Sequence, residues 1–320
     1  MNVIVYGAGS VGLGLASALL EAGEEVALVA RPATASALEE RGLRRSGIFG
    51  EIDHPPDSFR VSTALEELPG QAPDFVLVTT KSFDSGATAE SLAASRRIGP
   101  ETRIVSCQNG WGNAARFAAH FPDRQVWNAR VITGFRRPAP HHVEITVHAE
   151  PVHIGSLFGE PAHAVSALCA AIHRGGLPCE ATDQIAQDLW AKLLYNGLLN
   201  PLGAIFEVSY GEIGKSETAC RILRDLAHEI FEVMQASGYT THWPDAGAYL
   251  EHFFSVLLPP TAAHESSTLQ DLRAGKRTEI DALTGAVVRL GEEHSVAVPV
   301  NRTLLAMVQF IEADRRSNPT

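Results

Sequence analysis

Residues 2–12, NVIVYGAGSVG, decide the fold of the first half of this chain. The apolar run Asn2–Tyr6 predicts a buried strand, and the pattern of Ser10–Ala22 predicts a helix that follows almost at once. The residues that join strand and helix match the pattern G-x-G-x-x-G; they are Gly7, Ala8, Gly9, Ser10, Val11 and Gly12. A strand, this turn and a helix in that order are typical of a dinucleotide-binding site.

Each glycine of this motif has its own physical task. Gly7 allows the tight turn, Gly9 lets the backbone approach a pyrophosphate, and Gly12 lets the helix pack closely on the strand. The amides and the positive dipole end of the helix then bind the anion. The alternative is a glycine-rich turn without a ligand, but three glycines at this spacing after an N-terminal strand have little other use.

The end of the second expected strand, Glu25–Ala30, indicates which dinucleotide binds. A site for NAD usually carries Asp or Glu at this point to bind the ribose hydroxyls, whereas this chain has VARP at residues 29–32. Arg31 is a permanent cation whose fork fits a 2′-phosphate. The sequence therefore predicts NADP, used as NADPH, although Arg31 could also be a solvated surface residue.

Short apolar runs alternate with helical stretches through the rest of the first half. Runs that are apolar on both faces favour a parallel sheet covered by helices on both sides. Residues 43–61 are irregular and proline-rich and predict an inserted hairpin or loop, and residues 126–154 predict further strands with antiparallel pairing. The expected strands are Glu25–Ala30, Phe75–Thr80 and Arg103–Cys107, and the expected helices are Thr34–Arg41 and Ala162–His173.

The pattern becomes helical beyond residues 175–183, which carry two glycines and a proline and are interpreted as a hinge. The predicted fold class is α/β, with a Rossmann-type NADP-binding domain over residues 1–180. An all-helical C-terminal domain over residues 181–320 would carry the substrate and the catalytic groups. The helices expected there are Ile185–Leu202, Cys220–Ser237, Ala246–Val256, Arg277–His294 and Asn301–Ala313.

Bulk composition excludes several functional classes. A net charge of −11 argues against binding driven by the charge of nucleic acid or of an anionic membrane, because both need clustered Lys and Arg. The 4 cysteines show no C-x-x-C spacing, which favours reduced, buried thiols. No apolar run approaches the roughly 20 residues of a membrane span, and the N-terminus lacks the features of a signal peptide. A cytoplasmic protein is expected.

Two polar positions follow buried strands in the first half. Lys81 comes directly after Phe75–Thr80, and Asn109 follows the strand Arg103–Cys107. Ligands in open α/β sheets bind at the carboxyl ends of the strands, so both residues are candidates for ligand contact. Asn109 precedes a glycine and could equally be a turn residue.

The segment WAKLLYNGLLNP, residues 190–201, is the most informative part of the second half. Lys192, Asn196 and Asn200 are spaced by four residues, so they form one polar stripe on an otherwise apolar helix. A solvated helix face is the alternative. However, one ammonium and two amides are what a ketoacid needs: a proton donor and neutral groups that hydrogen-bond to its oxygens.

Another polar stretch, residues 266–281, could on its own be an exposed loop followed by a charged helix start. The 13 histidines show no H-E-x-x-H pattern and no cluster with Cys or acids, so no metal site is expected.

With these residues in view, the chain resembles the ketopantoate reductase (2-dehydropantoate 2-reductase) family over essentially its whole length. The segments that carry the resemblance are GAGSVG (7–12), TTKS (79–82), QNG (108–110), WAKLLYNGLLNPLGA (190–204), SSTLQDLRAGKRTEIDALTG (266–285) and VAVPVN (296–301). The resemblance implies an enzyme that transfers hydride from NADPH to the 2-keto group of 2-dehydropantoate, on the route to pantothenate and coenzyme A.

The resemblance also implies a role for individual residues. Lys192 matches the general acid, and Glu279 matches the catalytic-site glutamate, which we also place among the cofactor contacts. Asn109 matches a residue that contacts both cofactor and substrate. The substrate contacts further match Asn196, Asn200 and Ser267, and the basic cofactor contacts match Arg31 and Lys81.

One position departs from the family pattern. Where the family often has another substrate-contacting Asn before a Gly, this chain has Tyr210 before Gly211. The substrate could therefore be a different 2-oxoacid or an imine. A non-catalytic NADPH sensor is the less favoured alternative, because it has no reason to keep the stripe of Lys192, Asn196 and Asn200. The expected partners are the small-molecule substrate and, in a homodimer, a second copy.

Overall fold

The computed structural model describes residues 1–317, which fold into two compact units. The first unit combines Met1–Gln108 with Asn113–Ile185. The second combines the short loop Asn109–Gly112 with the chain from Ala186 onward. The boundary expected at residue 180 thus lies inside the first unit, and Asn109, expected in the first domain, belongs to the second.

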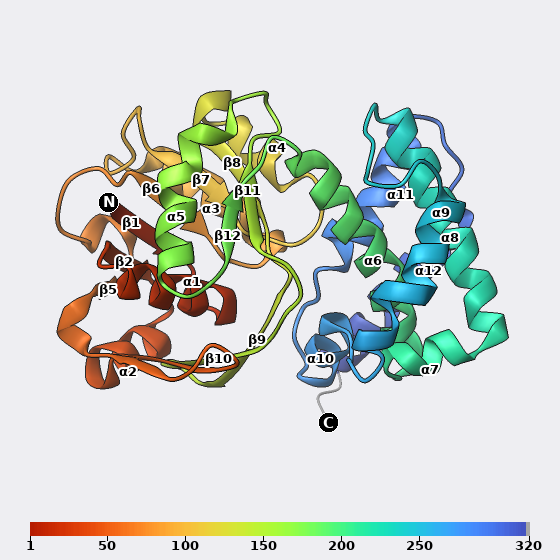
Figure 1. The fold of residues 1–320 in the computed structure, drawn as a ribbon, viewed down its shortest axis with the longest axis horizontal. Coiled ribbons are helices and arrows are strands. Elements are labelled where there is room, and N and C mark those ends of the chain that lie inside the picture. The colour runs from red at the N-terminus through yellow and green to blue at the C-terminus, as the bar shows by residue number, and fades with distance from the viewer. Residues whose placement is uncertain (318–320) are drawn as a thin grey trace. The chain divides into compact units, whose positions relative to one another are not determined.

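An eight-stranded sheet forms the centre of the first unit, in the order β12-β11-β8-β7-β6-β1-β2-β5 (Figure 1). The strands from β8 to β5 are all parallel, and β11 runs antiparallel to β8. The bounds are β1 (Asn2–Tyr6), β2 (Glu25–Val29), β5 (Arg60–Ser62), β6 (Phe75–Val78), β7 (Arg103–Ser106), β8 (Val126–Arg130), β11 (Val152–Gly155) and β12 (Cys179–Ala181).

Both faces of this sheet are covered, as the apolar strands predict. Along β1, Val3 and Val5 point to the core shared with α1 and α5, whereas Ile4 points to the opposite core with α3 and α4. Burial on both sides explains why β1 has no polar face. The helices are α1 (Ser10–Glu21), α2 (Pro32–Arg41), α3 (Ser85–Ala94), α4 (Asn113–Ala118) and α5 (Ser166–Arg174).

A smaller sheet, in the order β4-β3-β10-β9, contains the hairpin predicted within residues 43–61 and two of the strands predicted within residues 126–154, whose other strands, β8 and β11, join the large sheet. β3 pairs antiparallel with β4, and β9 pairs antiparallel with β10. Phe135 of β9 packs on α1 so closely that a side chain at Gly14 would overlap its ring. The bounds are β3 (Leu43–Gly47), β4 (Ile52–His54), β9 (Thr133–Ala139) and β10 (His142–His148).

The described part of the second unit, up to residue 317, is helical, as predicted, with no strand. Its longest helix, α6, contains the whole expected polar stripe. The α-helices are α6 (Ile185–Phe206), α7 (Tyr210–Lys215), α8 (Glu217–Ala236), α9 (Ala246–His252), α10 (Ser267–Arg273), α11 (Thr284–Glu293) and α12 (Pro299–Ser317), with a π-helix, η6 (Phe253–Leu257), after α9 and a 3-10 turn, η8 (Ile280–Ala282), before α11.

Two local predictions were wrong, and one segment whose structure was left open contains a helix. Residues 175–183, interpreted as a hinge, contain β12, whose short run Cys-Glu-Ala lacks the β-branched signature of a strand. The helix expected over Arg277–His294 starts only at Thr284, because Leu283 leaves the helical conformation with φ −97° and ψ −99°. The stretch 266–281 contains the helix α10, with the Ser266 side chain as its N-cap.

Candidate functional site

The turn between β1 and α1 has the geometry that a pyrophosphate needs. Gly9 is the N-cap residue of α1, and no side chain caps this helix end or places an acid in its first turn. The amides there are therefore open to an anion, which the helix dipole also favours. A side chain at Gly9 would lie 4.0 Å from the nearest atom, the Thr79 carbonyl oxygen, so the space beside this backbone is free within the fold.

Gly7 and Gly12 are required for a different reason. Gly7 has φ +110°, and a side chain on it would lie 2.8 Å from the amide nitrogen of Thr80. A side chain on Gly12 would overlap the Gly7 carbonyl oxygen and lie 2.6 Å from Thr79 Oγ1. Thr79 Oγ1 donates to that same carbonyl, and the Gly7 amide donates to Val29 O at 3.0 Å. The turn is thus fastened to β2 and β6, and its shape fits the dinucleotide predicted from the sequence.

The two basic residues assigned to the cofactor lie in the first unit. Arg31 is exposed at the N-cap position of α2, and its carbonyl accepts the amides of Thr34 and Ala35 at 2.9 Å each. Lys81 is half-buried after β6, and its carbonyl accepts from Gln108 Nε2 at 3.2 Å. Both side chains are therefore carried by short, well-anchored segments that follow sheet strands.

The second unit brings together three of the predicted site residues. Lys192 Nζ donates to Asn109 Oδ1 at 2.6 Å, and Asn109 Nδ2 donates to Glu279 Oε2 at 3.4 Å. Lys192 and Asn109 are half-buried, and the Glu279 residue is only 8% exposed. An ammonium, an amide and a carboxylate thus form one hydrogen-bonded chain that fixes the orientation of the Lys192 ammonium.

Asn109 is held by the loop Asn109–Gly112. Gly110 has φ +89°, and a side chain on it would overlap the Ala282 carbonyl oxygen, which accepts the Trp111 amide at 2.9 Å. The Trp111 ring lies 4.7 Å from the ring of Trp190 and 4.8 Å from that of Tyr239. The positive φ of this turn thus falls on Gly110 and not on Asn109, and the Asn109 side chain accepts from Lys192.

Glu279 is positioned through its neighbour Thr278. The Glu312 carboxylate of α12 accepts both the Thr278 amide, at 2.7 Å, and Thr278 Oγ1, at 2.6 Å. Thr278 is only 1% exposed, so this contact fixes the non-helical segment that precedes η8. Sequence reasoning missed Glu312, because nothing local links it to a threonine 34 positions earlier.

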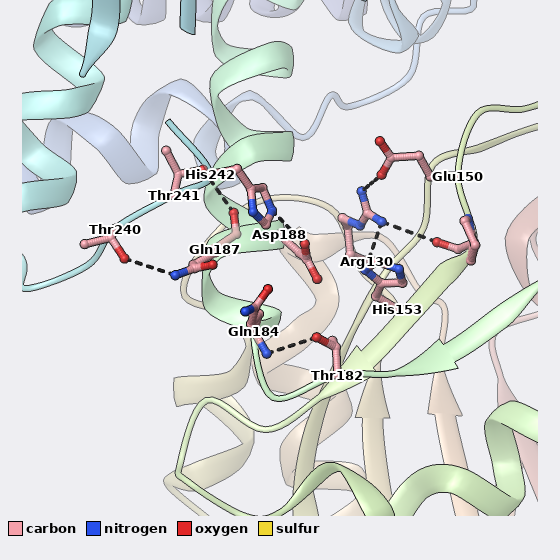
Figure 2. Close-up of polar contacts among 11 residues, drawn as sticks. Arg130, Glu150, His153, Thr182, Gln184, Gln187, Asp188, Thr240, Thr241 and His242 are labelled. Atoms are coloured by element: carbon pink, nitrogen blue, oxygen red, sulfur yellow. Dashed lines mark hydrogen bonds and ion pairs between the residues drawn. The ribbon is translucent and has the colours of Figure 1, made fainter. Parts of the chain in front are cut away.

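The first turn of α6, which carries Lys192 one turn further on, is anchored by the segment 240–242. His242 Nε2 lies 2.9 Å from Asp188 Oδ1, and Thr241 Oγ1 donates to Gln187 O at 3.2 Å (Figure 2). The side chain of Asp188 is 5% exposed. These contacts fix the first turn of α6, and with it the direction in which Lys192 leaves the helix toward Asn109.

The other two residues of the polar stripe differ in their surroundings. Asn196 is half-buried, and its side chain hydrogen-bonds to no residue among 1–317. Asn200 is only 2% exposed, and its Oδ1 accepts from the hydroxyl of Tyr210 at 2.8 Å. Tyr210 is itself 3% exposed, and burial raises the pKa of its phenol. Tyr210, which departs from the family pattern, therefore hydrogen-bonds directly to Asn200, one of the predicted substrate-binding residues.

Of the two neighbouring serines, the structure buries Ser266. Its hydroxyl accepts the Leu269 amide at 3.0 Å and donates to Asn200 O at 3.4 Å. Ser267, the serine predicted to bind the substrate, is exposed in the first turn of α10. Its side chain hydrogen-bonds to no other described residue. A ligand at Ser267 would thus find an unpaired hydroxyl.

Replacing Tyr210 with phenylalanine tests the link to Asn200. Without the phenol, the Asn200 amide loses its partner and can rotate, so we expect KM for the 2-oxoacid predicted from the sequence to change by about 3- to 10-fold, with a smaller change in kcat. Steady-state kinetics with the cofactor saturating would show this. Tyr195→Phe is the matched control, since Tyr195 OH donates to Thr261 instead. Equal effects of both variants would contradict a special role for Tyr210.

No group of three or more His, Cys, Asp and Glu side chains within residues 1–317 could hold a metal ion. Among the helices described there, none is long and apolar enough to cross a membrane.

Comparison with known proteins shows which family the chain matches. The family model described as "Ketopantoate reductase PanE/ApbA" matches residues 3–158, and its C-terminal counterpart matches residues 184–312. The chain belongs to the ketopantoate reductase family. Among curated members, the 2-dehydropantoate 2-reductase of Aquifex aeolicus is 33% identical, with 98% of this chain and 97% of the relative covered. That of Halobacterium salinarum is 31% identical, with 98% and 100% covered.

Solved structures share the architecture over nearly the whole chain. A PanE/ApbA family ketopantoate reductase from Ralstonia eutropha superimposes with a TM-score of 0.85 at 31% identity, covering 99% of this chain and 100% of that one. A D-mandelate dehydrogenase solved with NADH and anilino(oxo)acetate superimposes with a TM-score of 0.87 at 22% identity, covering 98% and 99%. The second likeness shows a common fold alone.

Proposed function

We propose that this ketopantoate reductase family member reduces 2-dehydropantoate to pantoate with NADPH. The observation that carries the proposal is the chain from Lys192 through Asn109 to Glu279, because it fixes a proton donor where a 2-oxoacid reductase needs one. The dinucleotide turn in the first unit supplies the other half of the chemistry. The curated relatives, named 2-dehydropantoate 2-reductase and matched over nearly their full length, support the substrate.

In this proposal the residues Gly7, Ala8, Gly9, Ser10, Val11 and Gly12 hold the pyrophosphate, and Arg31 and Lys81 hold the phosphates of NADPH. The bound cofactor supplies a hydride for C2 of the ketoacid. Lys192 donates a proton from Nζ to the ketone oxygen as negative charge develops there, and the amine left behind is neutral. Asn109 keeps the Lys192 ammonium oriented, and Glu279 holds Asn109 through its amide.

The remaining predicted ligands bind the substrate. Asn196 and Ser267 offer side chains that no described residue occupies. Asn200 offers its amide nitrogen, because its oxygen already accepts from Tyr210. Neutral amides and hydroxyls of this kind bind carboxylate and hydroxyl oxygens without adding a charge that would disturb Lys192.

A steady-state assay tests the proposal. Oxidation of NADPH at about 340 nm would be followed with 2-dehydropantoate, with NADH in parallel, and with a panel of other 2-oxoacids and imines. We expect kcat/KM to be highest for the pair 2-dehydropantoate and NADPH. A preference for another member of the panel by more than about tenfold would assign the chain to a different reductase. No turnover of any member would favour a sensor of the dinucleotide.

Three further expectations accompany the function. With its product on the route to pantothenate and coenzyme A, the enzyme belongs in the cytoplasm. Its acidic charge, −11, is consistent with no nucleic-acid partner. A homodimer stays a prediction, which light scattering on the purified protein would decide.

A further inference from the structure

A second arginine lies beside Arg31. Arg137 comes from β9, and its Nη2 donates to Thr34 Oγ1 at 2.7 Å and to Pro140 O at 2.8 Å. Thr34 stands in the first turn of α2, the helix for which Arg31 is the N-cap residue. Because Phe135 anchors β9 on α1 two residues earlier, the smaller sheet delivers the Arg137 guanidinium to the end of α2.

The two guanidinium groups interact as like charges. Partial burial lowers the pKa of Arg137, and the positive charge of Arg31 lowers it further. Within residues 1–317, neither side chain forms an ion pair with a carboxylate. Two neighbouring cations without an acid repel each other, so an anion bound at this point would relieve an unfavourable interaction.

The local backbone favours the same anion. The first turn of α2 contains no acidic residue, and no side chain caps its N-terminus. Both hydrogen bonds of the Arg137 side chain use Nη2, which leaves Nε and Nη1 without a partner among the described residues. A planar fork, a second arginine and a helix N-terminus together match the oxygens of a phosphate monoester.

We propose that Arg137 acts with Arg31 to bind the 2′-phosphate of NADPH and so sets the preference for NADPH over NADH. This inference rests on the proposed function only for the identity of the dinucleotide, since Arg31 lies at the end of β2 where the adenosine ribose is expected. The proposal adds Arg137, a residue of the smaller sheet, to the cofactor-binding residues of the eight-stranded sheet. Sequence analysis gave no sign of it, because Arg137 lies in a hairpin 106 positions after Arg31.

Binding measured without substrate separates this inference from the reaction. Dissociation constants for NADPH, NADH and adenosine 2′,5′-diphosphate would be determined by fluorescence and calorimetry for the wild type, Arg137→Gln and Arg31→Gln. We expect Arg137→Gln to raise the dissociation constants for NADPH and the diphosphate by about tenfold or more. The dissociation constant for NADH should stay unchanged, since a charged hydrogen bond is lost only where the 2′-phosphate is present. The unchanged NADH constant also shows that the variant is folded.

The matched control is Arg136→Gln, because Arg136 is the adjacent exposed arginine and its Nε donates to Glu144 at 2.7 Å. It should leave all three constants unchanged. If Arg137→Gln weakens NADH as much as NADPH, or neither of them, the proposal is wrong. A wild type that binds both dinucleotides equally would overturn it as well. Selective NADPH binding without turnover of 2-dehydropantoate would remove the proposed substrate and leave the role of Arg137 standing.

Discussion

Replacing Lys192 with alanine should lower kcat for 2-dehydropantoate reduction by about 10²- to 10⁴-fold, the usual contribution of a general acid. The reason is specific to the geometry, because Lys192 Nζ is the cation of the chain through Asn109 Oδ1, at 2.6 Å, to Glu279. Single-turnover reduction with NADPH already bound would measure the chemical step directly. The dissociation constant for NADPH should stay close to that of the wild type, because the cofactor residues of the first unit are untouched.

Two further variants separate the proton from the charge. Lys192→Arg keeps a cation but replaces the donor with a group that stays protonated, so kcat should fall nearly as far while KM changes little. Lys215→Ala removes an exposed lysine that pairs with Glu212 at 2.7 Å and should leave kcat unchanged. A Lys192→Ala variant with wild-type kcat would take Lys192 out of the role of general acid.

Replacing Gly12 with alanine should both destabilise the protein and abolish NADPH binding. The new methyl group would overlap the Gly7 carbonyl oxygen, which is backbone and cannot turn aside. Overpacking of this kind costs about 1–3 kcal/mol or more, and the turn that receives the pyrophosphate would have to shift. Thermal denaturation and NADPH titration of the same sample would record both losses.

Two other glycines supply matched controls for this prediction. Gly9→Ala introduces the same methyl group where the nearest atom is 4.0 Å away, so the fold should survive while NADPH binding weakens. Gly86→Ala in α3 meets nothing within 4 Å and should leave binding unchanged and stability equal or slightly higher. If Gly12→Ala kept both its stability and its affinity for NADPH, the close packing of the turn would not matter for the cofactor.

Local patterns predicted the parts of this molecule that depend on near neighbours. The strand, glycine turn and helix of residues 2–21 and the helical placement of the polar stripe on α6 were predicted correctly, since spacing along one strand or helix fixes which side chains share a face. The contact between Asn109 and Lys192 was not predicted, because the two residues lie 83 positions apart and the family resemblance only gave each of them a role.

Long-range contacts explain what the sequence could not reveal. Glu312 accepts from Thr278, 34 positions away, and Arg137 donates to Thr34, 103 positions away. In each pair both residues are of types common on protein surfaces, so neither stood out in the sequence. β12 was missed for a related reason, because its pairing with β11 supplies the stability that its own three residues lack. Tyr210 was recognised as unusual, but its partner Asn200 was visible only in the structure.

The loop Asn109–Gly112 has a consequence for recombining members of this family. Since it belongs to the second unit while its flanking residues belong to the first, the backbone passes between the units at 108/109, 112/113 and 185/186. A chimera with a single crossover near residue 185 would pair one parent's Asn109 with the other parent's Lys192. Functional hybrids should therefore require the tetrapeptide to be transplanted together with the C-terminal half.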